Sequence, residues 1–326
     1  MVRALTRRRF VKGVTAGLAG AALVPAASAI GDEPTTTDDD QDARLFKISL
    51  AEWSVHNAIF NGELANIDFP KAALSYGIDA VEFVNSCFYG KPAEKEYAHQ
   101  QLPKDIEAMR QRCTDLGVRP LLIMCDRLGL LGDPDPEART ATIEHTKPWV
   151  AAAKQLGCHS LRVNAHSKDV SFDEQIKLSI DGVGRLVRWA AENHELDILL
   201  ENHNQLTSHA GWLVSVITGV DHPRLGTLAD FGNFTYAPGK EYDRYKGMKE
   251  LMPWARGVSA KSYDFDQEGN ETKIDYARMV EIVSGAGYRG YIAVEYEGTR
   301  LGEPDGIRAT KKLLERVRAE LQQKQS

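Results

Sequence analysis

The chain has 326 residues, of which 43% are hydrophobic and 26% charged, and its formal net charge is -6 at pH 7. This composition is typical of a soluble globular protein and excludes a disordered or collagen-like chain. Because phosphate binding requires clustered Lys and Arg, the acidic charge argues against a nucleic-acid partner and favours a small or neutral ligand.

Residues 1–29 have the features of an export signal. The segment TRRRFVK, residues 6–12, precedes a small-residue apolar run that ends in Ala27-Ser28-Ala29, the A-x-A form of a cleavage site. The segment resembles a twin-arginine signal peptide, which implies a bacterial protein that is exported already folded and works in the periplasm. The run is short and rich in Gly and Ala, so we expect no stable membrane insertion after cleavage. A retained N-terminal anchor is the alternative.

The next segment, residues 30–43, is rich in acids and threonines and has no apolar period. Such a segment buries too little apolar surface to fold, so we expect a disordered acidic linker. The folded domain is therefore expected to span residues 44–326.

Eight short apolar runs follow in this domain, and each predicts a buried strand. They begin near residues 46, 78, 118, 159, 197, 225, 256 and 291, at intervals of 28 to 41 residues. One strand, one helix and two connections occupy about this length in a βα unit.

Helical patterns lie between the predicted strands. In LPKDIEAMRQRCTDLG, residues Ile106, Met109, Cys113 and Leu116 recur at three- and four-residue spacing, and Gly117 marks the end of the helix. Eight such units predict an α/β fold, a single-domain (β/α)8 TIM barrel, which typically needs about 250 residues. A doubly wound open sheet is the alternative, but no glycine-rich phosphate fingerprint follows the first strand.

The four cysteines show no metal-binding or disulfide spacing, and we expect core or free thiols.

Polar residues close most of the predicted strands, and in a barrel these strand ends form the mouth where substrates bind. The residues concerned are Glu52, Trp53, Ser54, His56, Glu82, Arg162, Asn164, His166, Glu201, His203, Asp230, Asn233, Lys261, Glu295 and Glu297. Glu201, Asp230 and Glu295 each follow at least two apolar residues. Burying three carboxylates together costs several kcal/mol unless cations offset it, so their pattern predicts a functional site.

The motifs LLENHN, TLADFGN, SAKSYDF and YIAVEYEG, in this order, resemble the sugar phosphate isomerase/epimerase group of xylose-isomerase-like TIM barrels. The resemblance covers about residues 45–317. It implies a divalent ion, Mn²⁺, Mg²⁺ or Co²⁺, bound at the mouth by a Glu, an Asp, a His and a Glu on strands five to eight. By position the metal ligands are Glu201, Asp230 and Glu295, whereas Ser259 stands at the place of the His.

The change from His to Ser259 removes a nitrogen ligand and leaves an oxygen-only site, which favours hard ions such as Mg²⁺, Mn²⁺ or Ca²⁺ over Zn²⁺. Lys261 follows two positions later and offers a positive charge of its own. Three arrangements stay open: an ion, Lys261, or both together stabilise the reacting oxygen.

The resemblance implies a sugar or keto-sugar isomerase or epimerase. Its reaction is proton transfer next to a carbonyl through an enediolate, with Glu201 and Glu295 as the acid/base pair and Lys261 as electrophile. The expected substrate-binding residues are Trp53, Glu82, Arg162, Asn164, His166, His203 and Asn233.

Two alternatives remain. One is a lyase or dehydratase that acts on a keto-sugar or keto-glycoside in the same site, and the other is a non-catalytic periplasmic sugar-binding protein. Endonuclease relatives need further histidines and a basic face, which the acidic charge of this chain disfavours. A homo-oligomer is compatible with the sequence.

Overall fold

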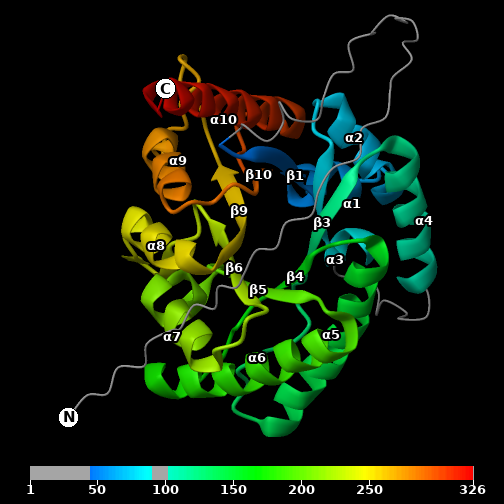
Figure 1. Ribbon diagram of the computed structural model, residues 1–326, viewed down its shortest axis with the longest axis vertical. Coiled ribbons are helices and arrows are strands. Elements are labelled where there is room, and N and C mark those ends of the chain that lie inside the picture. Colours follow the sequence, from blue (N-terminus) through cyan, green and yellow to red (C-terminus); the bar gives the residue numbers. More distant parts are fainter. Residues whose placement is uncertain (1–44, 90–101, 326) are drawn as a thin grey trace, which may run out of the picture. The chain divides into compact units, whose positions relative to one another are not determined.

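The centre of the molecule is a closed barrel of eight parallel strands (Figure 1). The computed structural model describes residues 45–89 and 102–325, and the expected signal peptide and linker, 1–29 and 30–43, lie outside them. The barrel order is β1-β10-β9-β6-β5-β4-β3-β2, and the neighbouring strands are parallel. The strands are β1 Lys47–Ala51, β2 Ala80–Val84, β3 Arg119–Met124, β4 Ser160–Val163, β5 Asp197–Glu201, β6 Leu225–Asp230, β9 Ala255–Ser262 and β10 Tyr291–Tyr296. The predicted (β/α)8 barrel is confirmed.

Helices surround the barrel (Figure 1). They are α1 His56–Phe60, α2 Phe69–Ser75, α3 Asn85–Tyr89, α4 Leu102–Leu116, α5 Pro136–Leu156, α6 Phe172–His194, α7 Ala210–Val220, α8 Arg244–Leu251, α9 Tyr276–Gly285 and α10 Glu303–Gln325, with 3-10 turns η2 Glu52–Val55, η3 Asn66–Asp68, η4 Gln205–Ser208 and η5 Met252–Trp254. A small antiparallel hairpin, β7 Thr235–Ala237 and β8 Lys240–Glu241, was not predicted. Within the described residues, we find no helix with the length and apolar character that a membrane span requires.

Helix α4 shows how the apolar spacing sets a local structure. Its buried face includes Ile106, Met109 and Cys113, which recur once per helical turn. Gly117 follows the last helical residue with φ +66°, a backbone conformation that glycine adopts without steric cost, and the chain turns there into β3.

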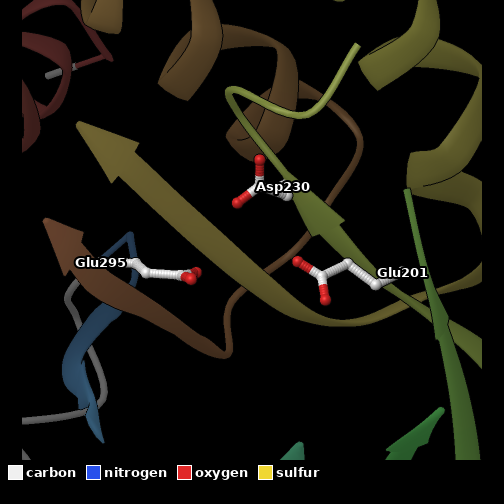
Figure 2. A group of neighbouring side chains, drawn as sticks. All are labelled: Glu201, Asp230 and Glu295. Carbon is white, nitrogen blue, oxygen red and sulfur yellow. The ribbon is translucent and has the colours of Figure 1, made fainter. Parts of the chain in front are cut away.

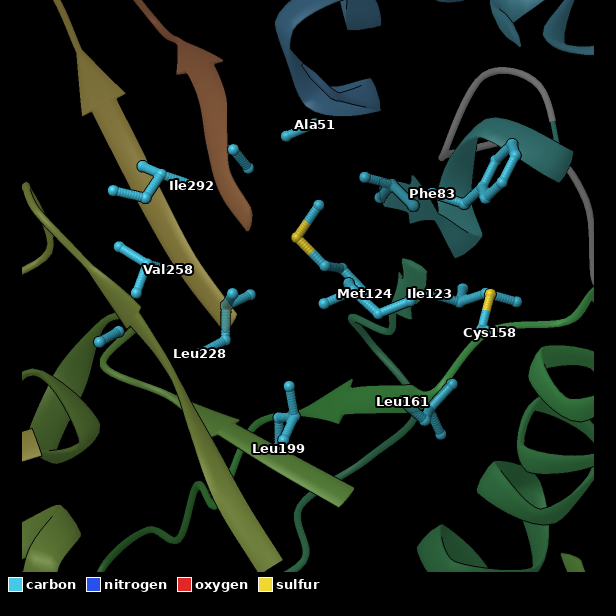
Figure 3. Close-up of a cluster of buried hydrophobic side chains, with 14 of the residues drawn as sticks. Ala51, Phe83, Ile123, Met124, Cys158, Leu161, Leu199, Leu228, Val258 and Ile292 are labelled. Carbon is cyan, nitrogen blue, oxygen red and sulfur yellow. The ribbon is translucent and has the colours of Figure 1, made fainter. Parts of the chain in front are cut away.

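The core consists of apolar side chains from all eight barrel strands and from the helices packed on them. Figure 3 shows part of it, including Phe83 of β2, Leu161 of β4 and Val258 of β9. The four cysteines are buried and free, as expected. Apolar side chains on the outer faces of the strands pack against the surrounding helices and hold the barrel together. The inward positions near the carboxyl ends of the strands can therefore carry polar groups.

A cavity of about 720 Å³ opens at the N-terminal ends of the strands, opposite the mouth. Arg119, Asp197 and Tyr291, the first residues of their strands, line it together with Glu82 from the middle of β2. Ser49 donates a 2.9 Å hydrogen bond to Oε1 of Glu82. Burial raises the pKa of Glu82 to about 8, so the folded protein holds this carboxyl protonated at neutral pH.

We predict that Glu82→Gln stabilises the fold increasingly as pH rises. Between pH 4.5 and about 8 the folded state keeps the Glu82 proton that the unfolded chain has lost, so the free energy of unfolding of the wild type falls through this window. The difference between variant and wild type should therefore grow by about 1.4 kcal/mol per pH unit, measured by urea unfolding. Glu107→Gln, at an exposed carboxylate paired with Arg110, is the control and should follow the wild type. Equal pH dependence in Glu82→Gln and wild type would contradict the prediction.

Candidate active site and metal centre

Three buried carboxylates meet at the mouth of the barrel (Figure 2). Glu201 ends β5, Asp230 ends β6 and Glu295 is the last but one residue of β10. One carboxylate oxygen of each lies within 4.8 Å of the others, and all three residues are buried. The structure thus brings together the three residues predicted to be metal ligands.

Local hydrogen bonds hold Asp230 in this place. Asn202 clamps the ends of β5 and β6, because its Nδ2 donates to the Asp230 carbonyl at 3.0 Å and its Oδ1 accepts from the Asp230 N–H at 2.8 Å. In the turn after β6, the N–H groups of Gly232 and Asn233 each donate to Oδ1 of Asp230 at 2.7 Å. These bonds fix one oxygen of Asp230 and leave the other to face the site.

Lys261 lies among these carboxylates and is only 1% exposed. Its Nζ is 3.2 Å from Oε1 of Glu295, 3.3 Å from Oε1 of Glu297 and 3.9 Å from Oδ2 of Asp230. Burial alone would lower the pKa of Lys261, but Glu295 and Asp230 outweigh it and raise the pKa well above its ordinary value. The charge that closes β9 is therefore a buried ammonium ion paired with the site.

Arg162 of β4 supplies a second buried cation. Its Nε lies 2.8 Å from Oε2 of Glu201, an ion pair without hydrogen-bond geometry, since neither atom has a hydrogen-bond partner among the described residues. On its other side Nη1 donates to Oδ1 of Asp126 at 2.6 Å. Arg162 and Lys261 thus contact different members of the carboxylate group.

Ser259 occupies the place where the resembled family has a metal-binding His. Its hydroxyl donates a hydrogen bond to Oε2 of Glu295. Asp230 pairs with Ser259 across β6 and β9, so the hydroxyl lies beside the carboxylates and holds one of them. Among the described residues, the possible metal ligands that meet here are therefore carboxylate oxygens, with no imidazole nitrogen.

The two glutamates have pKa values shifted in opposite directions. Burial, followed by the charges of Glu295 and Asp230, raises the pKa of Glu201 well above its ordinary value, although Arg162 opposes the shift. Burial would also raise the pKa of Glu295, but Lys261 and the Ser259 hydrogen bond outweigh it and hold that pKa below its usual range. Burial raises the pKa of Asp230 to about 7. The surroundings therefore favour the ionised form of Glu295 and the protonated form of Glu201.

The carboxylate group suits a divalent cation. Oε2 of Glu201 and Oδ2 of Asp230 are buried and have no hydrogen-bond partner in the described part of the chain. Arg162 and Lys261 approach these oxygens without making a hydrogen bond, so both oxygens can still bind an ion or a water molecule. Oxygen ligands are those that Mg²⁺, Mn²⁺ and Ca²⁺ prefer. Glu201, Asp230 and Glu295 thus fit the expected metal.

Four predicted substrate-binding residues lie beside Arg162 or the carboxylates. Nδ2 of Asn233 approaches Oε1 of Glu201 at 3.4 Å, and Nδ2 of Asn164 donates to Oδ1 of Asp126 at 2.7 Å. A ring nitrogen of His166 lies 2.8 Å from the carbonyl oxygen of His203. Burial, and then the charge of Arg162, lowers the pKa of His203 to about 3, so this imidazole is neutral.

Two predicted residues lie elsewhere. Trp53 stacks on His56, with ring centroids 4.2 Å apart, and meets Phe60 edge to face. None of its ring or polar contacts within residues 45–89 and 102–325 reaches the three carboxylates. Glu82 lines the cavity at the N-terminal ends of the strands and bonds to Ser49. Within the described residues, neither side chain forms a hydrogen bond, ion pair or ring contact with the carboxylate group, although the charge of Glu295 contributes to the raised pKa of Glu82.

Asp126 and Asn202 belong to the site but were missing from the predicted residues. Asp126 follows β3 and pairs with Arg162, which holds its pKa below the usual range against the effect of burial. A signal was present for both, because Asp126 closes the apolar run VRPLLIMCD as Asp230 closes its own, and Asn202 directly follows Glu201.

Two curated proteins have short segments similar to this chain. The C-glycoside deglycosidase alpha subunit of Arthrobacter globiformis is 44% identical over 66 residues, 19% of this chain and 19% of that protein. The 3'-dehydrocarminate deglycosidase alpha subunit of Microbacterium sp is 33% identical over 57 residues, 18% of this chain and 16% of that protein. The matches thus span under a fifth of the length of these relatives.

Solved structures share the fold at low sequence identity. The apo form of 3-keto-D-glucoside 4-epimerase from E. coli has a TM-score of 0.60 at 15% identity, over 77% of this chain and 94% of that chain. A D-tagatose 3-epimerase-like protein has a TM-score of 0.66 at 18% identity, over 86% and 100%. A xylose isomerase-like TIM barrel protein from Mycobacterium smegmatis, in complex with magnesium, has a TM-score of 0.59 at 15% identity, over 84% and 97%.

Residues 70–318 match the family described as Xylose isomerase-like TIM barrel. The match contains the barrel strands from β2 to β10 and all three buried carboxylates. Sequence match, barrel topology and site position therefore agree, and this chain belongs to the xylose isomerase-like TIM barrel family.

Proposed function

We propose that this protein is an exported enzyme that transfers a proton at the carbon next to a carbonyl group of a sugar or keto-sugar, as an isomerase or epimerase. The observation that carries the proposal is the buried carboxylate group, in which Glu201 and Glu295 have pKa values shifted in opposite directions. Two carboxyls whose environments separate their pKa values are suited to act as acid and base. The fold shared with sugar epimerases supports the choice of substrate class.

The ionised Glu295 is the base in this mechanism. It removes the proton from the carbon next to the carbonyl, and the electron pair of the C–H bond moves to form an enediolate. The protonated Glu201 faces the same space and supplies a proton to the intermediate. Delivery to the opposite face of the same carbon gives an epimer, whereas delivery to the neighbouring carbon gives an isomer.

Positive charge at the site stabilises the enediolate oxygen. The ammonium of Lys261 is fixed beside Glu295 and Asp230 before substrate binds, so no reorganisation is needed when charge develops. Glu201, Asp230 and Glu295 would hold a divalent ion, Mn²⁺, Mg²⁺ or Co²⁺. When bound, such an ion supplies Lewis-acid polarisation of the substrate carbonyl.

The side of the mouth formed by β3, β4 and β5 binds substrate hydroxyls in this proposal. Arg162 is held by Asp126, and the neutral His203 lies next to this pair. Asn164 has a buried Oδ1 without a hydrogen-bond partner among the described residues. A neutral imidazole and an unpaired amide oxygen are groups that bind sugar hydroxyls.

A second candidate reaction is the elimination of an aglycone from a keto-glycoside. The names of both curated relatives, which are deglycosidase alpha subunits, favour it. Glu295 would remove the same proton, the electron pair would form a carbon–carbon double bond, and the bond to the aglycone would break. The aglycone would leave with the proton of Glu201, so both reactions need the same two carboxyls.

We predict that Glu201→Gln and Glu295→Gln each lower solvent deuterium incorporation into a keto-sugar at least 100-fold, because either change removes one member of the acid/base pair. Nuclear magnetic resonance of a panel of ketohexoses and 3-keto-glucosides in D₂O measures the exchange. The same spectra distinguish an epimer from a released aglycone. The exposed Glu107→Gln should behave as wild type.

Retention of exchange by both variants would contradict the acid/base assignment. Binding of these sugars by the wild type without any turnover would instead indicate a sugar-binding protein.

We predict that Mn²⁺ binds more tightly as pH rises from 6 to 8, by about tenfold per pH unit for each proton displaced. The reason is that Asp230, with a pKa of about 7, and Glu201, with a raised pKa, must lose protons before they bind the ion. Titration calorimetry in two buffers of different ionisation enthalpy measures affinity and proton release together. Asp230→Asn should abolish tight binding. Full activity after chelation, with no ion in the purified protein, would rule out the metal and leave Lys261 as the electrophile.

We predict that replacing both Arg7 and Arg8 by Lys blocks export of the full chain, because the paired arginines are the defining feature of a twin-arginine signal. Immunoblots of periplasmic and cytoplasmic fractions measure the distribution. Lys12→Arg, which leaves the pair intact, is the control. Periplasmic protein at wild-type level in the double variant would contradict this route.

A further inference from the structure

Tyr263 lies at the rim of the site and has no role in the mechanism above. It follows β9 directly and stands two residues after Lys261. A Cβ atom on Gly232 would lie 2.6 Å from the Tyr263 hydroxyl oxygen and 3.1 Å from Cγ and Cδ of Lys261. The phenol and the lysine stem therefore pack side by side against the glycine whose N–H holds Asp230.

The outer part of Tyr263 is held in place by its neighbours. The Lys273 ammonium lies 4.6 Å from the ring centroid, and the backbone N–H of Tyr263 donates to Oε1 of Glu271 at 3.2 Å. The hydroxyl is different, because it has no hydrogen-bond partner in the described part of the chain and is not among the fully buried unpaired atoms. As far as residues 45–89 and 102–325 show, this donor is available to another molecule.

Burial and the nearby carboxylates keep this hydroxyl protonated. Burial, followed by the charge of Asp230, raises the pKa of Tyr263 above its ordinary value, and Glu297 and Glu295 act in the same direction. A neutral phenol donates one hydrogen bond at every pH at which the protein works.

We propose that the Tyr263 hydroxyl is a substrate-binding group, which donates a hydrogen bond to the same sugar oxygen that faces the Lys261 ammonium. This inference rests on the proposed function, in which that oxygen gains negative charge as the enediolate forms. A neutral donor and a cation that lie at the end of β9, beside one glycine, provide two contacts that strengthen together as the charge develops. No proton leaves Tyr263 in this role.

The first test is Tyr263→Phe, which keeps the ring, its packing and the Lys273 contact but removes the donor. We expect kcat/KM for the keto-sugar to fall about 10- to 100-fold, with most of the change in kcat, because the contact is strongest in the transition state. Tyr288→Phe is the matched control. Its hydroxyl donates to the Tyr291 carbonyl at 2.7 Å near the opposite end of the barrel, so its loss affects stability and leaves the kinetics unchanged.

Gly232→Ala provides a second, independent measurement, since its methyl group would displace the Tyr263 hydroxyl. We expect this substitution to lower kcat several-fold more in the wild-type background than in the Tyr263→Phe background, where the hydroxyl to be displaced is already absent. Strictly additive effects of the two substitutions would overturn the proposal, as would Tyr263→Phe with wild-type kcat and KM.

Two different results distinguish a failure of the proposed function from a failure of the role of Tyr263. Absence of deuterium exchange by the wild type with every sugar of the panel would overturn the proposed function and this inference with it. An active wild type whose Tyr263→Phe variant is equally active would overturn the role of Tyr263 alone.

Discussion

The structure depends on the burial of three carboxyl groups within a few ångströms of one another. The charge of Glu295 raises the pKa of both Glu201 and Asp230, and burial keeps solvent from screening it. The group is therefore stable only with protons or cations among its members. The protein supplies two cations, each from the strand next to its carboxylate. Arg162 of β4 contacts Glu201 of β5, and Lys261 of β9 contacts Glu295 of β10. The remaining imbalance favours the protonated form of Glu201 and the ionised form of Glu295, and the proposed acid/base chemistry depends on this difference.

The barrel meets this constraint with one charged side chain from each of five consecutive strands, β4, β5, β6, β9 and β10. Parallel strands place their carboxyl ends at a single mouth, and the register sets Lys261 beside Glu295 and Ser259 beside Asp230.

The connection after β5 has a strained backbone, since Asn204 and Gln205 both have positive φ angles, 61° and 46°. Thr207 accepts from the His203 N–H at 3.1 Å in the same turn, so the strained backbone holds His203 near Arg162 and Asp126.

Ser259 bears on whether a metal ion or the protein's own cations offset the charge of the carboxylates. An imidazole at this position would add a neutral ligand, whereas the hydroxyl donates to Glu295 and thereby stabilises its charged form. Lys261 acts in the same direction on the same carboxylate. The hydroxyl and the ammonium thus both favour the ionised form of Glu295, which its proposed role as general base requires.

The sequence by itself determined the barrel and the carboxylate group. Strand and helix spacing are local, and a carboxylate that ends an apolar run must lie at a strand end, so Glu201, Asp230 and Glu295 were recognisable one strand at a time. Other features were decided only by the tertiary structure, because they depend on distances between strands. Asp126 belongs to the site because it pairs with Arg162 of the next strand. Glu82 lines the cavity at the opposite end because it lies in the middle of β2 and not at the carboxyl end of that strand. The opposite pKa shifts of Glu201 and Glu295 likewise depend on which cation each one contacts. Those contacts form between strands and therefore require the closed barrel.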